Sequence, residues 1–156
     1  MTRVGIGYDV HRLAEGRRLV LGGVVIEHDR GLDGHSDADV LVHAIIDALI
    51  GAAGLADIGA LFPDTDPAYK NADSIGLLRD VAAQLEGRIE NIDATVVIER
   101  PRLAPHRDEM CERIAAALGI DSSRVNVKAT RGEGMGFVGR EEGVAAMAVA
   151  ALEPPA

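Results

Sequence analysis

Runs of apolar residues along this chain predict short strands separated by helices. Apolar and β-branched residues cluster at 3–8, 18–27, 92–99, 125–129 and 144–152, which predicts strands. The run at 18–27 is interrupted by Gly22-Gly23, as in a bulged strand or a hairpin. Longer apolar segments flanked by capping residues predict a helix from Ser36 to about Gly51 or Gly54, and further helices over 74–85 and 105–118.

Strands that bracket helices in a chain of 156 residues favour an α+β fold. We expect one domain over residues 1–156, with a mixed sheet of four or five strands and helices on one face. The strands are rich in alanine and poor in aromatic residues, so we expect another subunit to cover the second face. The stretch 55–73, rich in Gly, Pro and Asp, predicts a long loop of the kind that is usually functional.

Composition narrows the class of protein. A hydrophobic fraction of 47% is enough for a core, and a net charge of −9 argues against binding to nucleic acid or to an anionic membrane. The single cysteine, Cys111, cannot form an internal disulfide, and no apolar stretch is long enough to cross a bilayer, so we expect a cytoplasmic protein. Eighteen glycines and few aromatic residues favour loops that line a small-molecule site.

Two segments carry residues that suit a metal ion. Asp9 and His11 stand two residues apart at the expected end of a strand, so both side chains project from one face. On the first helix, Asp39, His43 and Asp47 form a narrow polar stripe on an otherwise apolar surface. Asp9, His11 and His43 would together form a two-His, one-carboxylate set with an open position, which is typical of catalytic zinc, and Asp47 would orient a neighbouring ligand. The alternatives are an Asp9–His11 hydrogen bond in a turn and a stripe that simply meets water.

Three further segments suit a phosphorylated ligand. The helix start at 34–37 offers free N–H groups for a phosphate, unless Ser36 or Asp37 caps it. The aspartates between 57 and 66 suit sugar or polyol hydroxyls, or are solvated turn residues. The glycine-rich segment 128–140 could bring N–H groups close to a phosphate while Glu133 holds a divalent ion, or it could be a flexible hairpin.

In this order, the segments resemble the family of 2-C-methyl-D-erythritol 2,4-cyclodiphosphate synthases, over essentially the whole chain from 4 to 152. The resemblance rests on Asp-Val-His at 9–11, His-Ser-Asp at 35–37, His43 with Asp47, and the motifs Asp-Ile-Gly and Phe-Pro-Asp-Thr-Asp between 57 and 66. It implies a homotrimer with sites between adjacent subunits. It also implies a phosphorus–oxygen lyase of the non-mevalonate isoprenoid pathway, which converts 4-diphosphocytidyl-2-C-methyl-D-erythritol 2-phosphate to the 2,4-cyclodiphosphate and releases CMP.

The resemblance implies roles for individual residues as well. Zinc would be held by Asp9, His11 and His43, and a second ion, Mg²⁺ or Mn²⁺, by Glu133. His35 and Thr130 would be catalytic. Phe137, Arg140 and Glu142 would line the central cavity of the trimer. The residues expected to bind substrate are Asp9, His11, His35, Ser36, Asp57, Ile58, Gly59, Phe62, Pro63, Asp64, Thr65, Asp66, Pro101, Arg102, Leu103, Thr130, Glu133, Phe137 and Arg140.

The sequence departs from the family pattern in one place. The family usually has three consecutive threonines before its glutamate, and here the residues are Thr130-Arg131-Gly132. The middle threonine has a transition-state role in the family, and that role does not transfer to Arg131, although a guanidinium can donate to phosphate. Two other functions therefore stay open: a metal-dependent binding module that has lost turnover, and an iron oxygenase with a two-His, one-carboxylate site.

Overall fold

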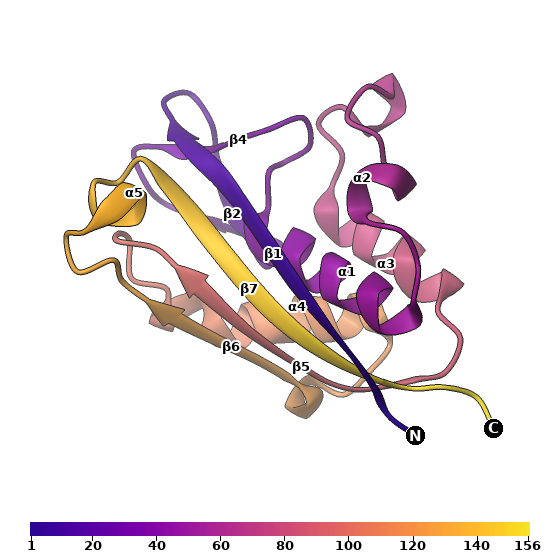
Figure 1. Ribbon diagram of the computed structural model, residues 1–156. Coiled ribbons are helices and arrows are strands. Elements are labelled where there is room, and N and C mark those ends of the chain that lie inside the picture. Colours follow the sequence, from indigo (N-terminus) through magenta and orange to yellow (C-terminus); the bar gives the residue numbers. More distant parts are fainter.

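A long antiparallel pair of strands forms the middle of the molecule. In the computed structural model, which describes residues 1–156, β1 (Arg3–Ala14) pairs with β7 (Gly143–Glu153) from Arg3 opposite Leu152 to Arg12 opposite Gly143. β4 (Gly31–Asp33) lies outside β1, and β5 (Arg88–Val97) lies outside β7, both antiparallel to their neighbours. β6 (Val125–Thr130) adds a parallel edge to β5. The mixed sheet predicted from the sequence therefore has five strands, in the order β4-β1-β7-β5-β6 (Figure 1).

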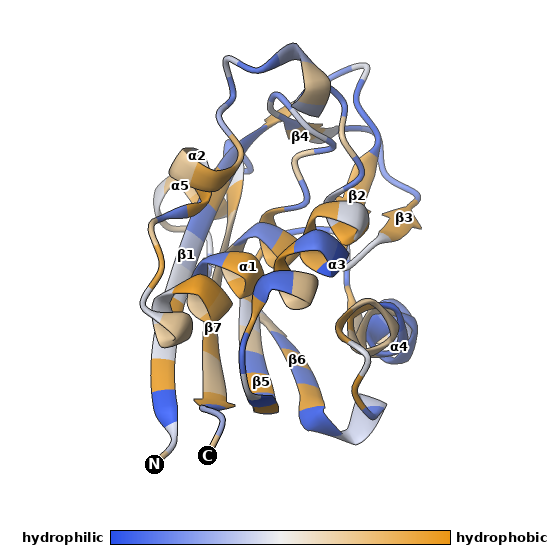
Figure 2. Cartoon of the chain, turned by 90° about the vertical axis from the view of Figure 1, so that its right-hand side faces the viewer, coloured by the Kyte–Doolittle hydropathy of each residue, from blue (hydrophilic) through white to orange (hydrophobic).

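The main helices lie on one face of this sheet, as predicted. They are α1 (Val40–Ala53), α3 (Ser74–Gln84) and α4 (Arg107–Leu118), and Figure 2 shows them on the same side of the strands. α1 packs directly against β1 and β7, and its apolar side chains from Val40 to Ala52 are buried between the sheet and the other helices. This burial stabilises a helix that is apolar nearly all round, since a helix of that composition is stable only inside a core.

Short elements complete the chain. β2 (Leu19–Leu21) and β3 (Val24–Ile26) form a separate hairpin whose turn is Gly22-Gly23, so the hairpin alternative is the correct one. The remaining elements are α2 (Ile58–Leu61), α5 (Gly136–Gly139) and the 3₁₀ turns η1 (Pro67–Tyr69), η2 (Ala104–His106) and η3 (Ser122–Arg124). No helix of the fold has the length and hydrophobicity that a bilayer span requires.

Three predictions of element bounds are corrected. β1 continues to Ala14 because β7 and then β4 supply hydrogen-bonding partners along its length, so Asp9 and His11 lie within a strand rather than at its end. α1 begins at Val40, not at Ser36, because Asp39 is the residue that caps it. The stretch 55–73 is not a continuous loop, since α2 and η1 are each capped there by an aspartate.

The opposite face of the sheet has no helix on it and is divided into two parts. On β1 and β7 it carries apolar side chains that are between 41% and 73% exposed: Val4, Ile6, Tyr8, Val10, Met147 and Val149. On β5 and β6 it is polar, with Lys128 Nζ 2.8 Å from Asp93 Oδ2. The sequence led us to expect that the chain leaves this face uncovered, and the structure confirms it.

Candidate metal centre and active-site pocket

Three side chains meet where the inner face of β1 packs against α1. Asp9 and His11 project from β1 toward the helix, as their spacing predicts, and His43 projects from α1 toward them. Asp9 Oδ2 lies 2.9 Å from His11 Nε2 and 3.1 Å from His43 Nδ1. One potential ligand atom from each residue falls within 4.8 Å of the other two, which is the spacing of atoms around one metal ion.

The electrostatics of this cluster depend on Asp9. Burial alone would raise the pKa of the Asp9 carboxyl, but its contacts with His11 and then His43 outweigh burial and lower that pKa to about 2. Burial likewise acts to lower the pKa of His11, and the neighbouring Asp9 carboxylate outweighs it and raises the pKa. Asp9 is therefore an anion at neutral pH and is available as a ligand for a cation.

The orientation of His11 fits a metal ligand. Its Nδ1 lies 3.0 Å from the carbonyl oxygen of Asp33, and only an Nδ1–H group can form a hydrogen bond there. That proton leaves Nε2 with a free lone pair in the neutral ring, and Nε2 is buried without a hydrogen-bond partner. Without a metal, a proton on Nε2 pairs with the Asp9 carboxylate at 2.9 Å, and a cation can replace that proton, so the residues present fit zinc.

A cavity of about 460 Å³ opens beside the cluster. It brings together segments that are distant in the sequence, and it is lined by His11, Gly34, His35, Ser36, His43, Ile58, Gly59, Phe62, Pro63, Asp64, Tyr69 and Leu77. His35 Nε2 lies 3.1 Å from the carbonyl oxygen of Asp66, which ties this ring to the 55–73 segment. Phe62 and Tyr69 pack edge to face and form an apolar wall. Most of the expected metal and methylerythritol-binding residues therefore share one pocket.

Some aspartates of that segment have local roles as well. Asp57 caps α2, its Oδ1 accepting from the Ala60 N–H at 2.9 Å, and Asp66 caps η1 by accepting from the Ala68 N–H at 2.9 Å. Asp64 lines the pocket, and the neighbouring Thr65 is exposed. The alternative of turn-forming aspartates is thus correct for two of these carboxylates, whereas Asp64 is the one that faces the cavity.

The polar stripe on α1 separates into three different functions. Asp39 is fully buried and accepts from the N–H groups of Val42, Gly22 and Gly23, so it joins α1 to the β2–β3 turn. Burial raises the pKa of Asp39 to about 6 despite these donors. Asp47 accepts from the Tyr8 N–H at 3.3 Å and contacts the backbone of β1 rather than a ligand ring. Only His43 contributes to the metal cluster.

The expected phosphate cradle at the start of α1 needs correction. Neither Ser36 nor Asp37 caps this helix, because the Asp39 carboxylate already occupies its N-terminus. Ser36 instead accepts from the Ala38 N–H and lies 3.2 Å from His43 Nε2, with its hydroxyl at the pocket wall. The side chains that line the pocket wall near this helix start are those of His35 and Ser36.

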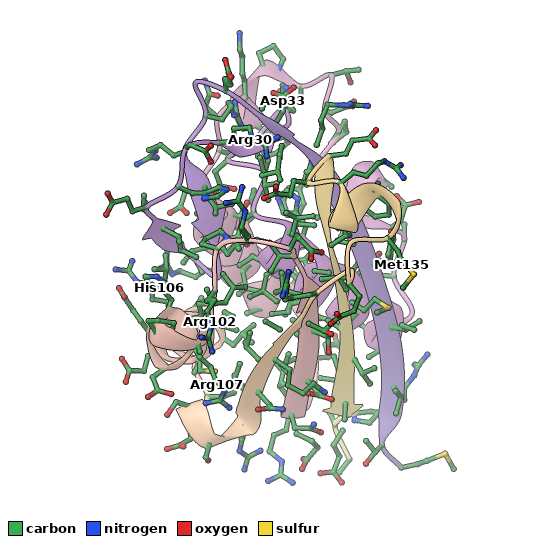
Figure 3. The ribbon with its side chains drawn as sticks, turned by 90° about the vertical axis from the view of Figure 1, so that its left-hand side faces the viewer. Arg30, Asp33, Arg102, His106, Arg107 and Met135 are labelled. Atoms are coloured by element: carbon green, nitrogen blue, oxygen red, sulfur yellow. The ribbon has the colours of Figure 1, made fainter.

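The remaining predicted site residues lie elsewhere on the chain. Leu103 lines a second cavity of about 280 Å³ between α4 and β6, next to the cis Arg100–Pro101 bond. Figure 3 shows Arg102 and Arg107 in this region, on the left of the view. Met135 lies on the right, across the strands and near α5. Thr130, the last residue of β6, is exposed, as are Glu133 after that strand and Arg140 after α5, and Phe137 lines a small cavity together with His11 and Glu142. Apart from Phe137, which shares that small cavity with His11, one chain thus does not bring these residues to the metal cluster.

The departure from the family pattern has a structural explanation. Arg131 Nη2 donates to Glu99 Oε1 at 2.8 Å, and the Gly132 N–H donates to Glu99 Oε2 at 2.9 Å. A Cβ atom on Gly132 would lie 2.7 Å from the Gly139 backbone nitrogen, so the loop has no room for a threonine in this arrangement. The Glu99 carboxylate, whose side chain is 8% exposed, therefore holds the segment that precedes Glu133.

Sequence reasoning missed one residue that contacts the centre, Ser74, and the residue behind it, Asp37. Ser74 Oγ lies 2.8 Å from His43 Nε2, and Asp37 contacts Ser74 in turn. Ser74 had only been predicted as the first residue of a helix, and Asp37 as a possible cap. No local signal reveals these contacts, because they exist only once α3 lies beside α1.

A mixed α+β sheet that presents a carboxylate and two histidines beside a cavity is an arrangement typical of metal-dependent enzymes. The sequence matches the YgbB family over residues 2–153, and the chain belongs to this family. Relatives from Salinibacter ruber and Geotalea uraniireducens, both named 2-C-methyl-D-erythritol 2,4-cyclodiphosphate synthase, are 60% identical over 154 residues, which cover 97% of this chain and 98% of each relative.

Solved structures show the same fold. The bifunctional IspDF from Campylobacter jejuni matches with a TM-score of 0.95 at 43% identity, over 99% of this chain and 43% of that chain. The IspF of Plasmodium falciparum, solved as a CDP complex, matches with a TM-score of 0.86 at 32% identity, over 99% of this chain and 97% of that chain. The α+β prediction and the resemblance to this family are therefore confirmed.

Proposed function

We propose that this chain is a 2-C-methyl-D-erythritol 2,4-cyclodiphosphate synthase. It converts 4-diphosphocytidyl-2-C-methyl-D-erythritol 2-phosphate to the 2,4-cyclodiphosphate and CMP, as a phosphorus–oxygen lyase of the non-mevalonate isoprenoid pathway. The observation that carries the proposal is the Asp9–His11–His43 cluster beside a cavity of about 460 Å³. The names of relatives at 60% identity support it. A single domain over residues 1–156 and a cytoplasmic location belong to the same proposal.

The reaction fits a site without a protein nucleophile. A phosphate monoester is already anionic at neutral pH, so its oxygen can attack the β-phosphorus without a general base. The step requires that two like-charged phosphates be held together and that the charge on the departing CMP be offset. When bound at Asp9, His11 and His43, zinc would supply Lewis acidity toward a phosphate oxygen.

The residues of the pocket then position the substrate. His35, held by the Asp66 carbonyl, and Ser36 present an imidazole and a hydroxyl beside the metal cluster, where phosphates would lie. Asp64 offers a carboxylate to the methylerythritol hydroxyls, and the Phe62–Tyr69 wall contacts its carbon skeleton. The cavity walled by Leu103 suits the cytosine ring, with Pro101 and Arg102 beside it.

The functional unit that we propose is a homotrimer. The apolar strip of β1 and β7 supports this assembly because its side chains, up to 73% exposed for Ile6, need a cover. Adjacent subunits would then complete the site with the segment from Thr130 to Glu133, and Glu133 would hold Mg²⁺ or Mn²⁺, which would offset the charge of the diphosphate. Phe137, Arg140 and Glu142 would face the central axis.

The decisive experiment measures product. Purified protein is incubated with the CDP-linked substrate, zinc and magnesium, and cyclodiphosphate and CMP are followed by phosphorus NMR. We expect His43→Ala to abolish CMP release while circular dichroism shows an intact fold. His28→Ala is a matched control, because the His28 and His43 side chains are 11% and 12% exposed and His28 lies outside the cluster.

The outcomes separate the alternatives. Wild-type protein that binds zinc and CDP but forms no cyclodiphosphate would contradict the proposal and favour a metal-dependent binding module, in which the Arg131–Glu99 pair has replaced the threonine. Fe(II)-dependent oxygen uptake would favour an oxygenase. Turnover by a metal-stripped His43→Ala variant would contradict the role of this cluster.

A further inference from the structure

The nitrogen of His43 that faces away from the metal cluster is hydrogen-bonded inside the protein. Nδ1 faces Asp9, whereas Nε2 lies 2.8 Å from Ser74 Oγ and 3.2 Å from Ser36 Oγ. Ser74 is fully buried at the start of α3 and is held there by packing against α1. The direction of the His43–Ser74 hydrogen bond therefore determines which ring nitrogen can bind a metal ion.

Asp37 determines that direction. Its Oδ2 accepts from the Ser74 N–H at 3.0 Å, and its Oδ1 accepts from the Asp39 N–H at 3.1 Å. The same Oδ1 also contacts the Ser74 hydroxyl, so the Ser74 O–H donates to the carboxylate. With its only proton committed to Asp37, Ser74 Oγ can act toward His43 only as an acceptor. Nε2 of His43 must then carry a proton.

We infer that Ser74 and Asp37 are positioning residues that fix the tautomer and the ring orientation of His43. With the proton on Nε2, the neutral ring keeps its lone pair on Nδ1, the nitrogen that faces Asp9 and His11. The chain Asp37–Ser74–His43 thus holds Nδ1 ready to bind zinc, as the Asp33 carbonyl does for Nε2 of His11. Mutation of a hydrogen-bonded partner of this kind typically weakens metal affinity about 10- to 100-fold.

This network also determines what Ser36 can do. Ser36 Oγ accepts from the Ala38 N–H, and the protonated Nε2 of His43 cannot accept a proton from it. The Ser36 hydroxyl proton is therefore free to donate into the pocket that Ser36 lines.

The inference rests on the proposed function only in taking His43 as a zinc ligand, since zinc binding is measured without substrate.

The experiment measures zinc affinity by competition with a chelator. We expect Ser74→Ala to weaken zinc binding about 10- to 100-fold and Ser74→Thr, which keeps the hydroxyl, to retain most of the affinity. Asp37→Asn should also weaken binding. The double variant should bind no more weakly than Ser74→Ala, because Asp37 acts through Ser74.

The matched control is Asp73→Ala. Asp73 caps the same helix by accepting from the Ile75 N–H at 3.1 Å and does not contact His43. We expect its zinc affinity to equal that of the wild type. Equal losses in Asp73→Ala and Ser74→Ala would overturn the inference, because they would attribute the effect to the start of α3 alone. Unchanged affinity in Ser74→Ala and Asp37→Asn would overturn it as well.

A second measurement needs no variant and so cannot be defeated by misfolding. In zinc-loaded wild-type protein with ¹⁵N-labelled histidine, long-range ¹H–¹⁵N correlations should show His43 protonated at Nε2 and metal-bound at Nδ1. The opposite assignment would overturn the inference. If these results hold while the wild type releases no CMP, the proposed function fails and the positioning role stands. If CMP is released but His43 has the other tautomer, only the positioning role fails.

Discussion

Asp9 illustrates how a single residue gains its chemistry from its neighbours. As an isolated aspartate it would have a pKa of 3.8, but within hydrogen-bonding distance of two imidazoles its pKa is about 2. The same contacts raise the pKa of His11. In the metal-free chain the cluster is therefore stabilised by internal ion pairing, and a bound cation replaces protons on the imidazoles.

This pairing predicts a pH dependence of stability. Because the pKa of this carboxyl is lower in the folded state than in the unfolded state, the ionised group stabilises the fold. This stabilisation is complete above the unfolded-state pKa and is lost as the pH falls through the folded-state pKa. We expect metal-free wild type to be about 2 kcal/mol more stable than Asp9→Asn at about pH 5, and about half of that at about pH 3. Urea unfolding across this range measures the difference. Asp80→Asn, an exposed site on α3, should show no such trend, and a constant difference for Asp9→Asn would contradict the assignment.

At the scale of elements, the contact between β1 and α1 positions the metal ligands. The sequence shows a Gly-x-Gly at 5–7 that does not fit a dinucleotide loop, and its purpose is visible only in the packing. A Cβ atom on Gly7 would lie 1.9 Å from the Ala44 carbonyl oxygen, and one on Gly5 would lie 2.0 Å from that of Ala48. Glycine thus lets the strand approach the helix closely enough for Asp9 and His11 to reach His43.

We expect Gly7→Ala to lower the free energy of unfolding by about 3 kcal/mol, because the clash is with backbone atoms that no rotamer change relieves. The zinc affinity of Gly7→Ala should fall as well, since the added methyl group forces β1 and α1 apart. Gly51→Ala is the matched control: its Cβ would meet only ordinary contacts at 3.7 Å or more, and alanine favours the helix by up to about 1 kcal/mol. Denaturant unfolding measures the stability of both variants, and equal stabilities would refute this explanation.

At the scale of the whole molecule, one chain does not bring all of the predicted site residues together. The metal cluster opens on one pocket, whereas Leu103, Thr130 and Glu133 belong to other surfaces of the same chain. The apolar strip on β1 and β7 lies on the sheet face opposite the helices. Assembly through that strip would cover it and bring neighbouring chains' segments within reach of each pocket.

We expect Ile6→Glu to dissociate the proposed trimer, because it would place a charge where an apolar contact forms, in a side chain that is 73% exposed in the single chain. Val25→Glu, on the separate β2–β3 hairpin and 54% exposed, should leave the assembly unchanged. Sedimentation velocity distinguishes these states. A monomeric wild type, or a trimeric Ile6→Glu variant, would contradict the proposed assembly.

Much of this protein could be predicted from its sequence where the signal is local. Apolar runs and caps predicted the main strands and helices, and the two-residue spacing of Asp9 and His11 correctly placed both on one face of β1. Two of the three corrected bounds depend on non-local partners. The end of β1 depends on strands β7 and β4, and the cap of α1 depends on the hairpin turn that Asp39 also binds.

The sequence by itself determined the α+β class, the family and the three candidate zinc ligands, because periodicity and motif spacing are properties of neighbouring residues. Only the tertiary structure decided that Asp39 and Asp47 support the backbone while His43 faces the cluster. Only the tertiary structure showed that Ser74 contacts Nε2 of His43 and that Glu99 accepts from Arg131. Such contacts join residues more than thirty positions apart, and their hydrogen-bond directions exist only when helices and strands are packed.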